Sequence, residues 1–121
     1  SIRVVSIIGR YLEHSRIFWF SNKGEAEVYL GSADWMPRNL DRRVEAVSPV
    51  EEPELREQLE RLLNLYLDDN RGAWDMLSDG SFSQRKPSRK TIHSQLELTD
   101  LWRHGLPATN TNDKTESEIA E

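Results

Sequence analysis

The spacing of hydrophobic positions changes along the chain: short β-branched and aromatic runs fill its first half, and a helical repeat follows. Residues 3–8 form the first run, which is too short for a helix and predicts a buried strand. A break follows it, and we expect a short turn or helical piece over residues 9–13. Residues 43–47 alternate polar and apolar side chains, which predicts a half-buried strand that ends at Pro49.

Residues 16–20 and 27–30 predict a β-hairpin. Both runs are largely apolar, and the polar residues 21–24 between them include an asparagine and a glycine, which tolerate the positive φ angles of hairpin turns. We expect the aromatic side chains of the first run to pack in the core rather than to stack on bases. These side chains are Phe18, Trp19 and Phe20.

The clearest helix is expected over residues 53–69. Pro53 suits a first helical turn, and apolar side chains follow it at helical intervals. Acidic side chains gather near the positive end of its dipole, where a solvated face is favoured over a metal site. The apolar positions are Leu55, Leu59, Leu62, Leu63 and Tyr66, and the acidic ones are Glu51, Glu52 and Glu54.

The segments after this helix mix loops with one more helix. Residues 72–80 contain apolar side chains able to pack and a strong Asp-Gly turn signal. Residues 84–90 are basic and read as a solvated loop. An amphipathic helix is expected over residues 94–104, stopped by Gly105 and Pro107.

Composition limits the class of protein. The 121 residues are 36% apolar, enough for one domain with a modest core, and they include no cysteine for a disulfide or a thiolate metal site. The net charge of −5 argues against broad nucleic-acid binding, so any polyanion must be bound locally. No apolar run approaches the roughly 20 residues of a membrane span, and no signal peptide opens the chain. We expect a soluble protein.

The composition of the first and last residues gives the expected domain boundaries. The chain opens abruptly in an apolar run, which indicates a fragment of a larger enzyme. Its last residues are polar, acidic and without aromatic side chains, a composition typical of disorder. We expect a folded domain over residues 1–107 and a disordered acidic tail over residues 108–121.

Candidate chemistry is concentrated between residues 10 and 45. If the strand at residues 16–20 continues back through His14, then His14 and Arg16 lie on one face. Further along the chain, small residues offer backbone N–H groups to a phosphate, and three arginines within six positions suit its oxygens. These residues are Gly31 and Ser32, and Arg38, Arg42 and Arg43. Together they predict a site for a phosphoryl group.

Two continuous motifs in this region closely resemble the last domain of bacterial type 1 polyphosphate kinase, and the resemblance extends from about Ile2 to about Pro87. The motifs are Gly9-Arg10-Tyr11-Leu12-Glu13-His14-Ser15-Arg16-Ile17-Phe18 and Val28-Tyr29-Leu30-Gly31-Ser32-Ala33-Asp34-Trp35-Met36-Pro37-Arg38-Asn39-Leu40-Asp41-Arg42-Arg43-Val44-Glu45. The resemblance implies the phospholipase D fold, an α/β (α+β) domain with a mixed β-sheet packed against helices. It also implies that His14 is the histidine of the second of two His-x-Lys motifs.

The resemblance implies an ATP:polyphosphate phosphotransferase. In that family the γ-phosphoryl group of ATP passes reversibly to a histidine in the preceding domain and then to polyphosphate. His14 would act on the other side of the nucleotide, as an acid–base group or as a donor to the phosphates. Arg16 would offset developing negative charge. Without the preceding domain the chain is expected to be inactive.

Further roles are expected within the site. We assign ATP or phosphate binding to His14, Gly31, Ser32, Arg38, Asn39, Arg42 and Arg43. Asp34 and Asp41 are expected to orient arginines rather than to hold a metal, and Glu13 and Glu45 have the same reading. Mg²⁺ is implied by the resemblance, with its ligands outside this chain. Trp35, Met36 and Pro37 are expected to pack and shape the loop, and His93 and His104 to lie on the surface.

The implied partners are ATP or ADP, polyphosphate, the remaining domains of the same enzyme and further copies of the full-length enzyme. The implied location is cytoplasmic, with membrane association of the full-length enzyme left open. A secondary interpretation of residues 84–90 is that they guide polyphosphate.

Two alternative functions remain. One is a phospholipase D-like phosphodiesterase or nuclease, which Arg16 in place of lysine and Asp34 in place of asparagine weigh against; Ser21 also departs from that pattern, since it stands where an aspartate would fall. The other is a non-catalytic binding or assembly module.

Overall fold

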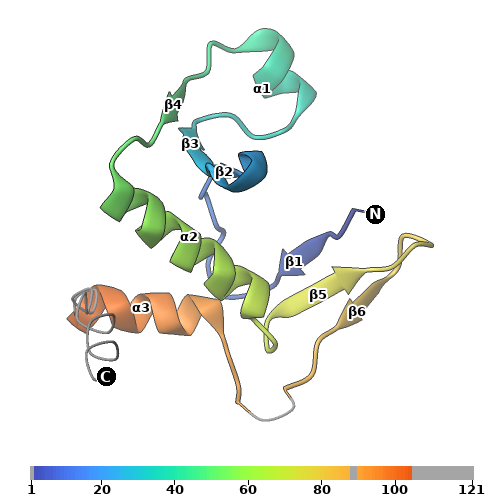
Figure 1. Cartoon of the computed structure of the whole chain (residues 1–121). Coiled ribbons are helices and arrows are strands. Elements are labelled where there is room, and N and C mark those ends of the chain that lie inside the picture. Colours follow the sequence, from blue (N-terminus) through green and yellow to red (C-terminus); the bar gives the residue numbers. More distant parts are fainter. Residues whose placement is uncertain (1, 88–89, 105–121) are drawn as a thin grey trace, which may run out of the picture.

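Helices and strands alternate irregularly along residues 2–87 and 90–104, which are the residues that the computed structural model describes. Figure 1 shows their arrangement. In chain order they are β1 (Val5–Ile7), β2 (Ile17–Phe20), the 3-10 turn η1 (Asn22–Gly24), β3 (Glu27–Gly31), α1 (Pro37–Arg42), β4 (Val47–Pro49), α2 (Pro53–Asp68), β5 (Ala73–Met76), β6 (Phe82–Gln84) and α3 (Ser94–His104).

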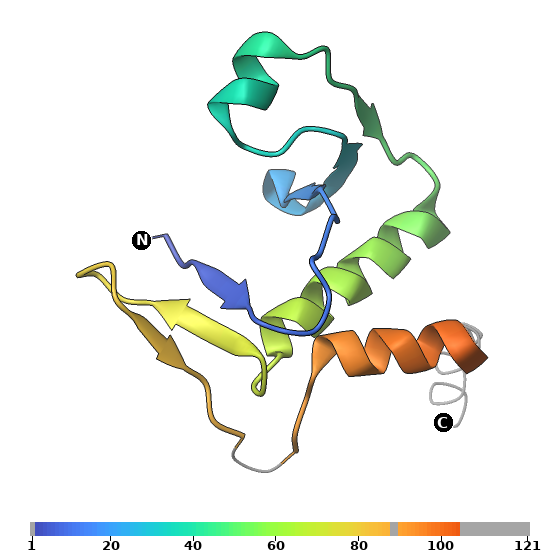
Figure 2. The same cartoon turned by 180° about the vertical axis from the view of Figure 1, so that it is seen from behind.

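The strands form two three-stranded sheets, in the orders β1-β5-β6 and β2-β3-β4, and every strand pair described is antiparallel. Helix α2 connects β4 of one sheet to β5 of the other, and α3 lies beside it (Figures 1 and 2). The α+β class is therefore confirmed, and the strands that we expected in one mixed sheet are divided between two. No helix within the described ranges is long and apolar enough to cross a membrane.

The predicted hairpin is confirmed. Ile17 pairs with Leu30, and Phe20 pairs with Glu27. Between the strands the backbone turns through positive φ angles at Asn22 (37°), Lys23 (57°) and Gly24 (107°), as the composition of the turn predicted.

The predicted strand at residues 43–47 is wrong in position, because β4 begins at Val47 and includes Pro49, which we expected to end it. Pro49 lies opposite Tyr29 at the edge of the sheet, where a missing N–H group is tolerated. Val44, an apolar position of the expected alternation, is fully exposed. The strand is therefore set by backbone pairing with β3 and not by burial of alternate side chains.

Strands β5 and β6 form where we predicted no strand. No helix forms over residues 9–13, where we expected a short turn or a helical piece. Ile7 pairs with Ala73 although many residues separate them, so no local pattern predicts this pair. The predicted Asp-Gly turn is confirmed, because Gly80 has a φ of 83° and Leu77 N–H donates to the Ser81 carbonyl at 2.8 Å.

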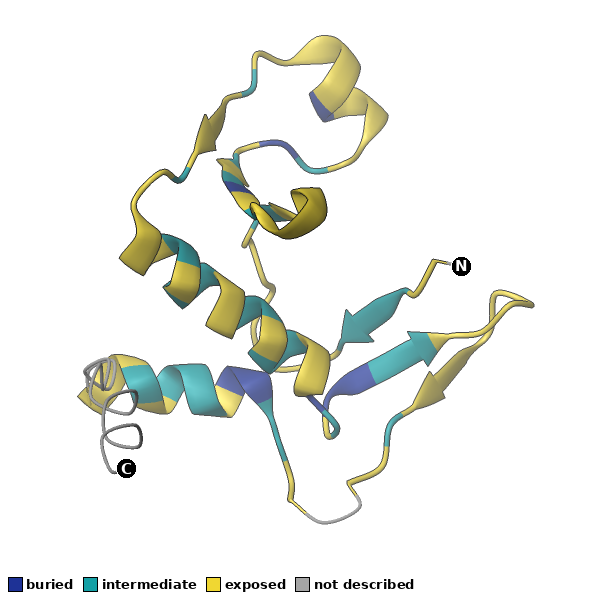
Figure 3. Cartoon of the chain, viewed as in Figure 1, coloured by how far each residue is buried: buried dark blue, intermediate teal, exposed yellow. Residues whose placement is uncertain are grey.

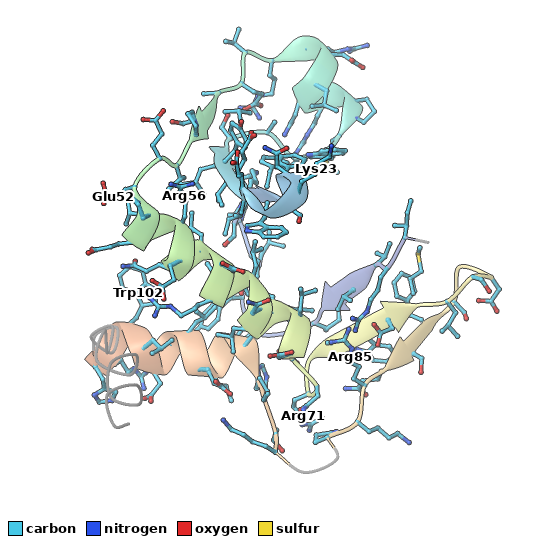
Figure 4. All side chains as sticks on the ribbon, viewed as in Figure 1. Lys23, Glu52, Arg56, Arg71, Arg85 and Trp102 are labelled. Atoms are coloured by element: carbon cyan, nitrogen blue, oxygen red, sulfur yellow. The ribbon has the colours of Figure 1, made fainter. Side chains whose placement is uncertain are left out.

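One residue of the basic run is not solvated as we expected. The Arg85 side chain is 14% exposed and pairs with both oxygens of Asp75 at 2.7 Å. It also donates to the carbonyls of Leu67 and Asp69 at the end of α2, at 2.6 and 3.0 Å. Figure 4 labels this side chain beside β5. Arg85 therefore ties α2 to the β5–β6 hairpin.

Few apolar side chains are fully buried. Among the described residues these are Val28, Ala33 and Ala73, and Figure 3 shows that most of the ribbon is exposed or intermediate. Trp19 and Phe20 are exposed, which corrects the expectation that they pack in a core. The predicted helices α2 and α3 are confirmed as elements. The expected stop at Gly105 and Pro107 and the expected tail over residues 108–121 lie outside the described residues.

Candidate functional site

The segment that carries His14 has no regular secondary structure and leads into β2. The expectation that the strand continues back through His14 is wrong, because β2 begins at Ile17. The last backbone hydrogen bond toward β3 runs from Gly31 N–H to the Arg16 carbonyl, at 2.9 Å. The His14 side chain is therefore presented from an exposed loop.

Arg16 joins this loop to the one that follows β3. Its Nε and Nη2 atoms lie 2.9 and 2.8 Å from Oδ1 of Asp34, and its Nη1 donates to the His14 carbonyl at 3.0 Å. The Arg16 side chain is 23% exposed and that of Asp34 41%. Asp34 thus holds Arg16 in the manner expected of an orienting carboxylate, and Arg16 in turn holds the main chain of His14.

The positive charges of the site act on Asp34. The hydrogen bond from Arg16 holds the pKa of Asp34 below its ordinary value of 3.8, against a smaller opposing effect of burial. The charges of Arg16, Arg38 and His14 lower that pKa further. Arg16 makes the largest of these contributions, through its hydrogen bond.

The backbone N–H groups that we expected to bind phosphate are already engaged. Gly31 N–H donates to Arg16, and Ser32 N–H donates to the Ala46 carbonyl at 3.0 Å. The Ser32 hydroxyl donates to Glu45 and accepts from Ala46 N–H. A Cβ atom on Gly31 would lie 2.8 Å from the Phe18 ring, so glycine is required here for close packing. In this conformation these residues shape the loop.

The arginine run lies on and beside α1. Arg43 Nε lies 3.6 Å from Glu45 Oε1, whereas Arg38 and Arg42 are exposed and make no ion pair with the described residues. Asn39 is 2% exposed, and its Oδ1 has no hydrogen-bond partner among them. Asp41 likewise makes no ion pair within this part of the chain. The accessible cations of α1 are therefore Arg38 and Arg42, and Asn39 faces the interior.

The expected packing of the loop before α1 is not observed. Trp35 is 80% exposed and Met36 49%, although the Trp35 ring lies 6.1 Å from that of Phe18. The described residues therefore do not bury these two apolar side chains.

The carboxylates of the site do not suit the implied Mg²⁺. Asp34 is bound by Arg16, and Glu45 is engaged by Ser32 and Arg43. Within residues 2–87 and 90–104 no three histidine, aspartate or glutamate side chains are grouped so that they could hold a metal ion. We therefore assign no metal ligand to these residues.

Two residues that support the site were missed from the sequence. Gln95, at the start of α3, donates to Glu13 and to the Tyr11 carbonyl, and the Tyr66 hydroxyl on α2 donates to Glu13. Tyr66 was expected only as an apolar position of a helix. Gln95 gave no signal, because its contacts lie more than 80 positions earlier in the chain.

Comparison with known proteins gives consistent results. The family model described as polyphosphate kinase C-terminal domain 2 matches residues 1–95. The polyphosphate kinase of Prochlorococcus marinus (strain MIT 9313) is 66% identical over 110 residues, covering 89% of this chain and 15% of that protein. The polyphosphate kinase of Parasynechococcus marenigrum (strain WH8102) is 68% identical over 109 residues, covering 88% of this chain and 15% of that protein.

A solved structure, the polyphosphate kinase from Porphyromonas gingivalis, is similar in fold. It has a TM-score of 0.77 and 37% sequence identity over 84% of this chain and 16% of its own. The chain therefore spans about 15% of the length of these relatives.

Proposed function

Because the chain belongs to the polyphosphate kinase family, we propose that it forms part of the active site of an ATP:polyphosphate phosphotransferase. The reaction proposed is reversible transfer of the ATP γ-phosphoryl group to a histidine in the preceding domain and from there to the terminal oxygen of polyphosphate. The observation that carries the proposal is the exposed His14, whose carbonyl is bound by the Arg16 of the Arg16–Asp34 pair, in a chain that matches this family over residues 1–95. Mg²⁺ would take its ligands from outside these residues.

His14 is the group proposed to act at the transferring phosphoryl group. Its side chain is exposed, and Arg16 holds the main-chain carbonyl of the residue from which the imidazole projects. It acts there as an acid–base group for the leaving oxygen or as a hydrogen-bond donor to the phosphates. Both roles need the imidazole within hydrogen-bond reach of a phosphate oxygen.

The arginines divide into two groups by their partners. Arg38 and Arg42 are exposed and without an ion pair among the described residues, so we assign them direct contacts to phosphate oxygens. Arg16 and Arg43 have carboxylate partners. Arg16 contributes its charge from a fixed position, as a preorganised cation does. We no longer assign phosphate binding to Gly31, Ser32 and Asn39. We propose that they hold the shape of the loop and of α1.

The remaining domains of the same enzyme are the proposed partner of the exposed apolar side chains near the site. Trp35 is 80% exposed and Leu40 61%, both on the segment that carries the arginines. Exposed apolar area of this kind typically marks an interface. We expect this chain by itself to be inactive, and the family resemblance favours an oligomeric, cytoplasmic full-length enzyme.

Replacement of His14 tests the proposal. In the full-length enzyme His14→Ala should remove most ATP-dependent polyphosphate synthesis and leave the melting temperature unchanged, because the side chain is exposed. His104→Ala is the matched control, since that histidine is 73% exposed and, among the described residues, forms an ion pair with Asp100 alone. Near-normal synthesis by His14→Ala would refute the assignment.

A further inference from the structure

One side chain holds the backbone of the segment that leads to His14. Gln95 Oε1 accepts from Tyr11 N–H at 3.1 Å, and Gln95 Nε2 donates to the Tyr11 carbonyl at 2.7 Å. Both polar groups of one peptide residue are thus paired with one primary amide, as a neighbouring strand would pair them. Gln95 is 4% exposed, and its bonds to Tyr11 are partly buried.

The same amide also fixes the residue next to His14. Gln95 Nε2 lies 3.0 Å from Glu13 Oε1, and the Tyr66 hydroxyl donates to Glu13 Oε2 at 3.2 Å. Both oxygens of this carboxylate are therefore held, one from α3 and one from α2. Burial raises the pKa of Tyr66, and the nearby Glu13 raises it further, although a hydrogen bond from Ser15 acts in the opposite direction. The raised pKa keeps the Tyr66 hydroxyl protonated, so that it can donate to Glu13.

Gly9 makes room for this arrangement. A Cβ atom at this position would lie 2.2 Å from Gln95 Oε1 and 2.5 Å from Gln95 Cδ. The amide group would have to move, and it is this group that bonds to Tyr11 and Glu13. Gly9 has no positive φ angle, so an alanine is compatible with the backbone there and acts only through Gln95.

We propose that Gln95 is a positioning residue for His14, clamping the loop of residues 11–13 to α3 so that the imidazole is presented at a fixed point. This inference rests on the proposed function of His14. A neutral amide is required, because it alone both accepts from and donates to Tyr11 and also donates to the Glu13 carboxylate. Alanine would leave the loop without either bond, and glutamate would set a second carboxylate against Glu13.

The test uses the full-length enzyme and polyphosphate synthesis from ATP. Gln95→Ala should lower kcat about 10- to 100-fold, because misplacement of a reacting group by about 1 Å has an effect of this size. The KM values for ATP and polyphosphate should change by no more than about twofold, since the arginines proposed to bind phosphate are untouched.

Asn70→Ala is the matched control. The Asn70 amide also clamps a loop, donating to the Lys90 carbonyl at 2.9 Å and accepting from Ile92 N–H at 2.9 Å, but it does not touch residues 11–13. It should reduce thermal stability as Gln95→Ala does and leave kcat unchanged. An equal loss of kcat in both variants would show that general destabilisation is responsible and would overturn the inference.

Gly9→Ala displaces the Gln95 amide but keeps the glutamine in the chain. If Gln95→Ala does not fold, this variant tests whether Gln95 positions His14. It should lower kcat like Gln95→Ala, and the double variant should lose little more than either single variant, because both changes remove the same bonds. Normal kcat in Gly9→Ala would overturn the inference. If His14→Ala abolishes synthesis while Gln95→Ala and Gly9→Ala keep normal kcat, only the clamp is refuted. If His14→Ala is itself near normal, the proposed function fails.

Discussion

Two clusters of polar side chains, each built around an aspartate, differ in what they leave exposed. Asp69 lies where α2, β5 and α3 meet and is 0% exposed, whereas the Asp34 side chain at the candidate site is 41% exposed. The Asp69 carboxylate accepts five hydrogen bonds from the protein, and the Asp34 carboxylate accepts only from Arg16 among the described residues. The first cluster is closed and builds the fold. The second leaves charge at the surface, where we propose that phosphate binds.

The Asp69 junction satisfies the backbone where α2 ends and α3 begins. Oδ1 accepts the N–H groups of Arg71, Gly72 and Ala73 at 2.7–3.1 Å, and Oδ2 accepts the N–H and hydroxyl of Ser94 at 2.8 and 2.7 Å. Burial alone would raise the pKa of Asp69, but these hydrogen bonds outweigh it and hold the pKa below 3.8. The junction thus has a charged centre that is buried from solvent.

Asp69→Ala should have the largest effect on stability. Five hydrogen-bond donors would lose their acceptor, and those of Gly72, Ala73 and Ser94 belong to buried residues. Leaving such buried groups unpaired costs about 3–5 kcal/mol of folding free energy. Thermal or denaturant unfolding followed by circular dichroism measures the loss. Asp79→Ala, which removes only an exposed turn contact to Ser81, is the control and should change little. Equal midpoints in the two variants would show that the buried carboxylate stabilises the fold no more than an exposed one.

Acid should weaken the Asp69 junction. The pKa of Asp69 is lower in the folded chain than its ordinary value of 3.8, so its stabilising contribution is present above that value. The contribution is lost as the pH falls through the lower, folded-state pKa. Wild-type unfolding free energy should therefore fall below about pH 4 more steeply than that of Asp69→Ala, because the variant lacks this group. Parallel pH profiles for the two proteins would refute this linkage.

Asp34→Ala should have the smallest effect on stability and a clear effect on activity. The pair with Arg16 is partly exposed, and solvent screens it, so the melting midpoint should stay close to that of the wild type. In the full-length enzyme kcat should fall roughly tenfold, since Arg16 would no longer hold His14 in place. A large fall in the midpoint with normal kcat would make Asp34 a structural residue like Asp69 and remove the contrast.

The sequence predicted the elements whose signals are local. The hairpin followed from two apolar runs around a turn with Asn22 and Gly24, and α2 and α3 followed from apolar side chains at helical spacing. The β1–β5 pair did not, because its partners are distant and the strands are short. The same limit applied to Arg85, which read as part of a basic loop and instead binds Asp75.

The sequence by itself determined the family, the α+β class and the identity of the chemical groups, because motifs around His14 and residues 31–43 are contiguous and specific. Only the tertiary structure decided what each group is bound to. It paired Arg16 with Asp34, engaged the N–H groups of Gly31 and Ser32, and brought Gln95 against the loop before His14. The physical reason is that a hydrogen bond depends on distance and direction in space, and residues far apart in the chain meet these conditions only when the whole domain has folded.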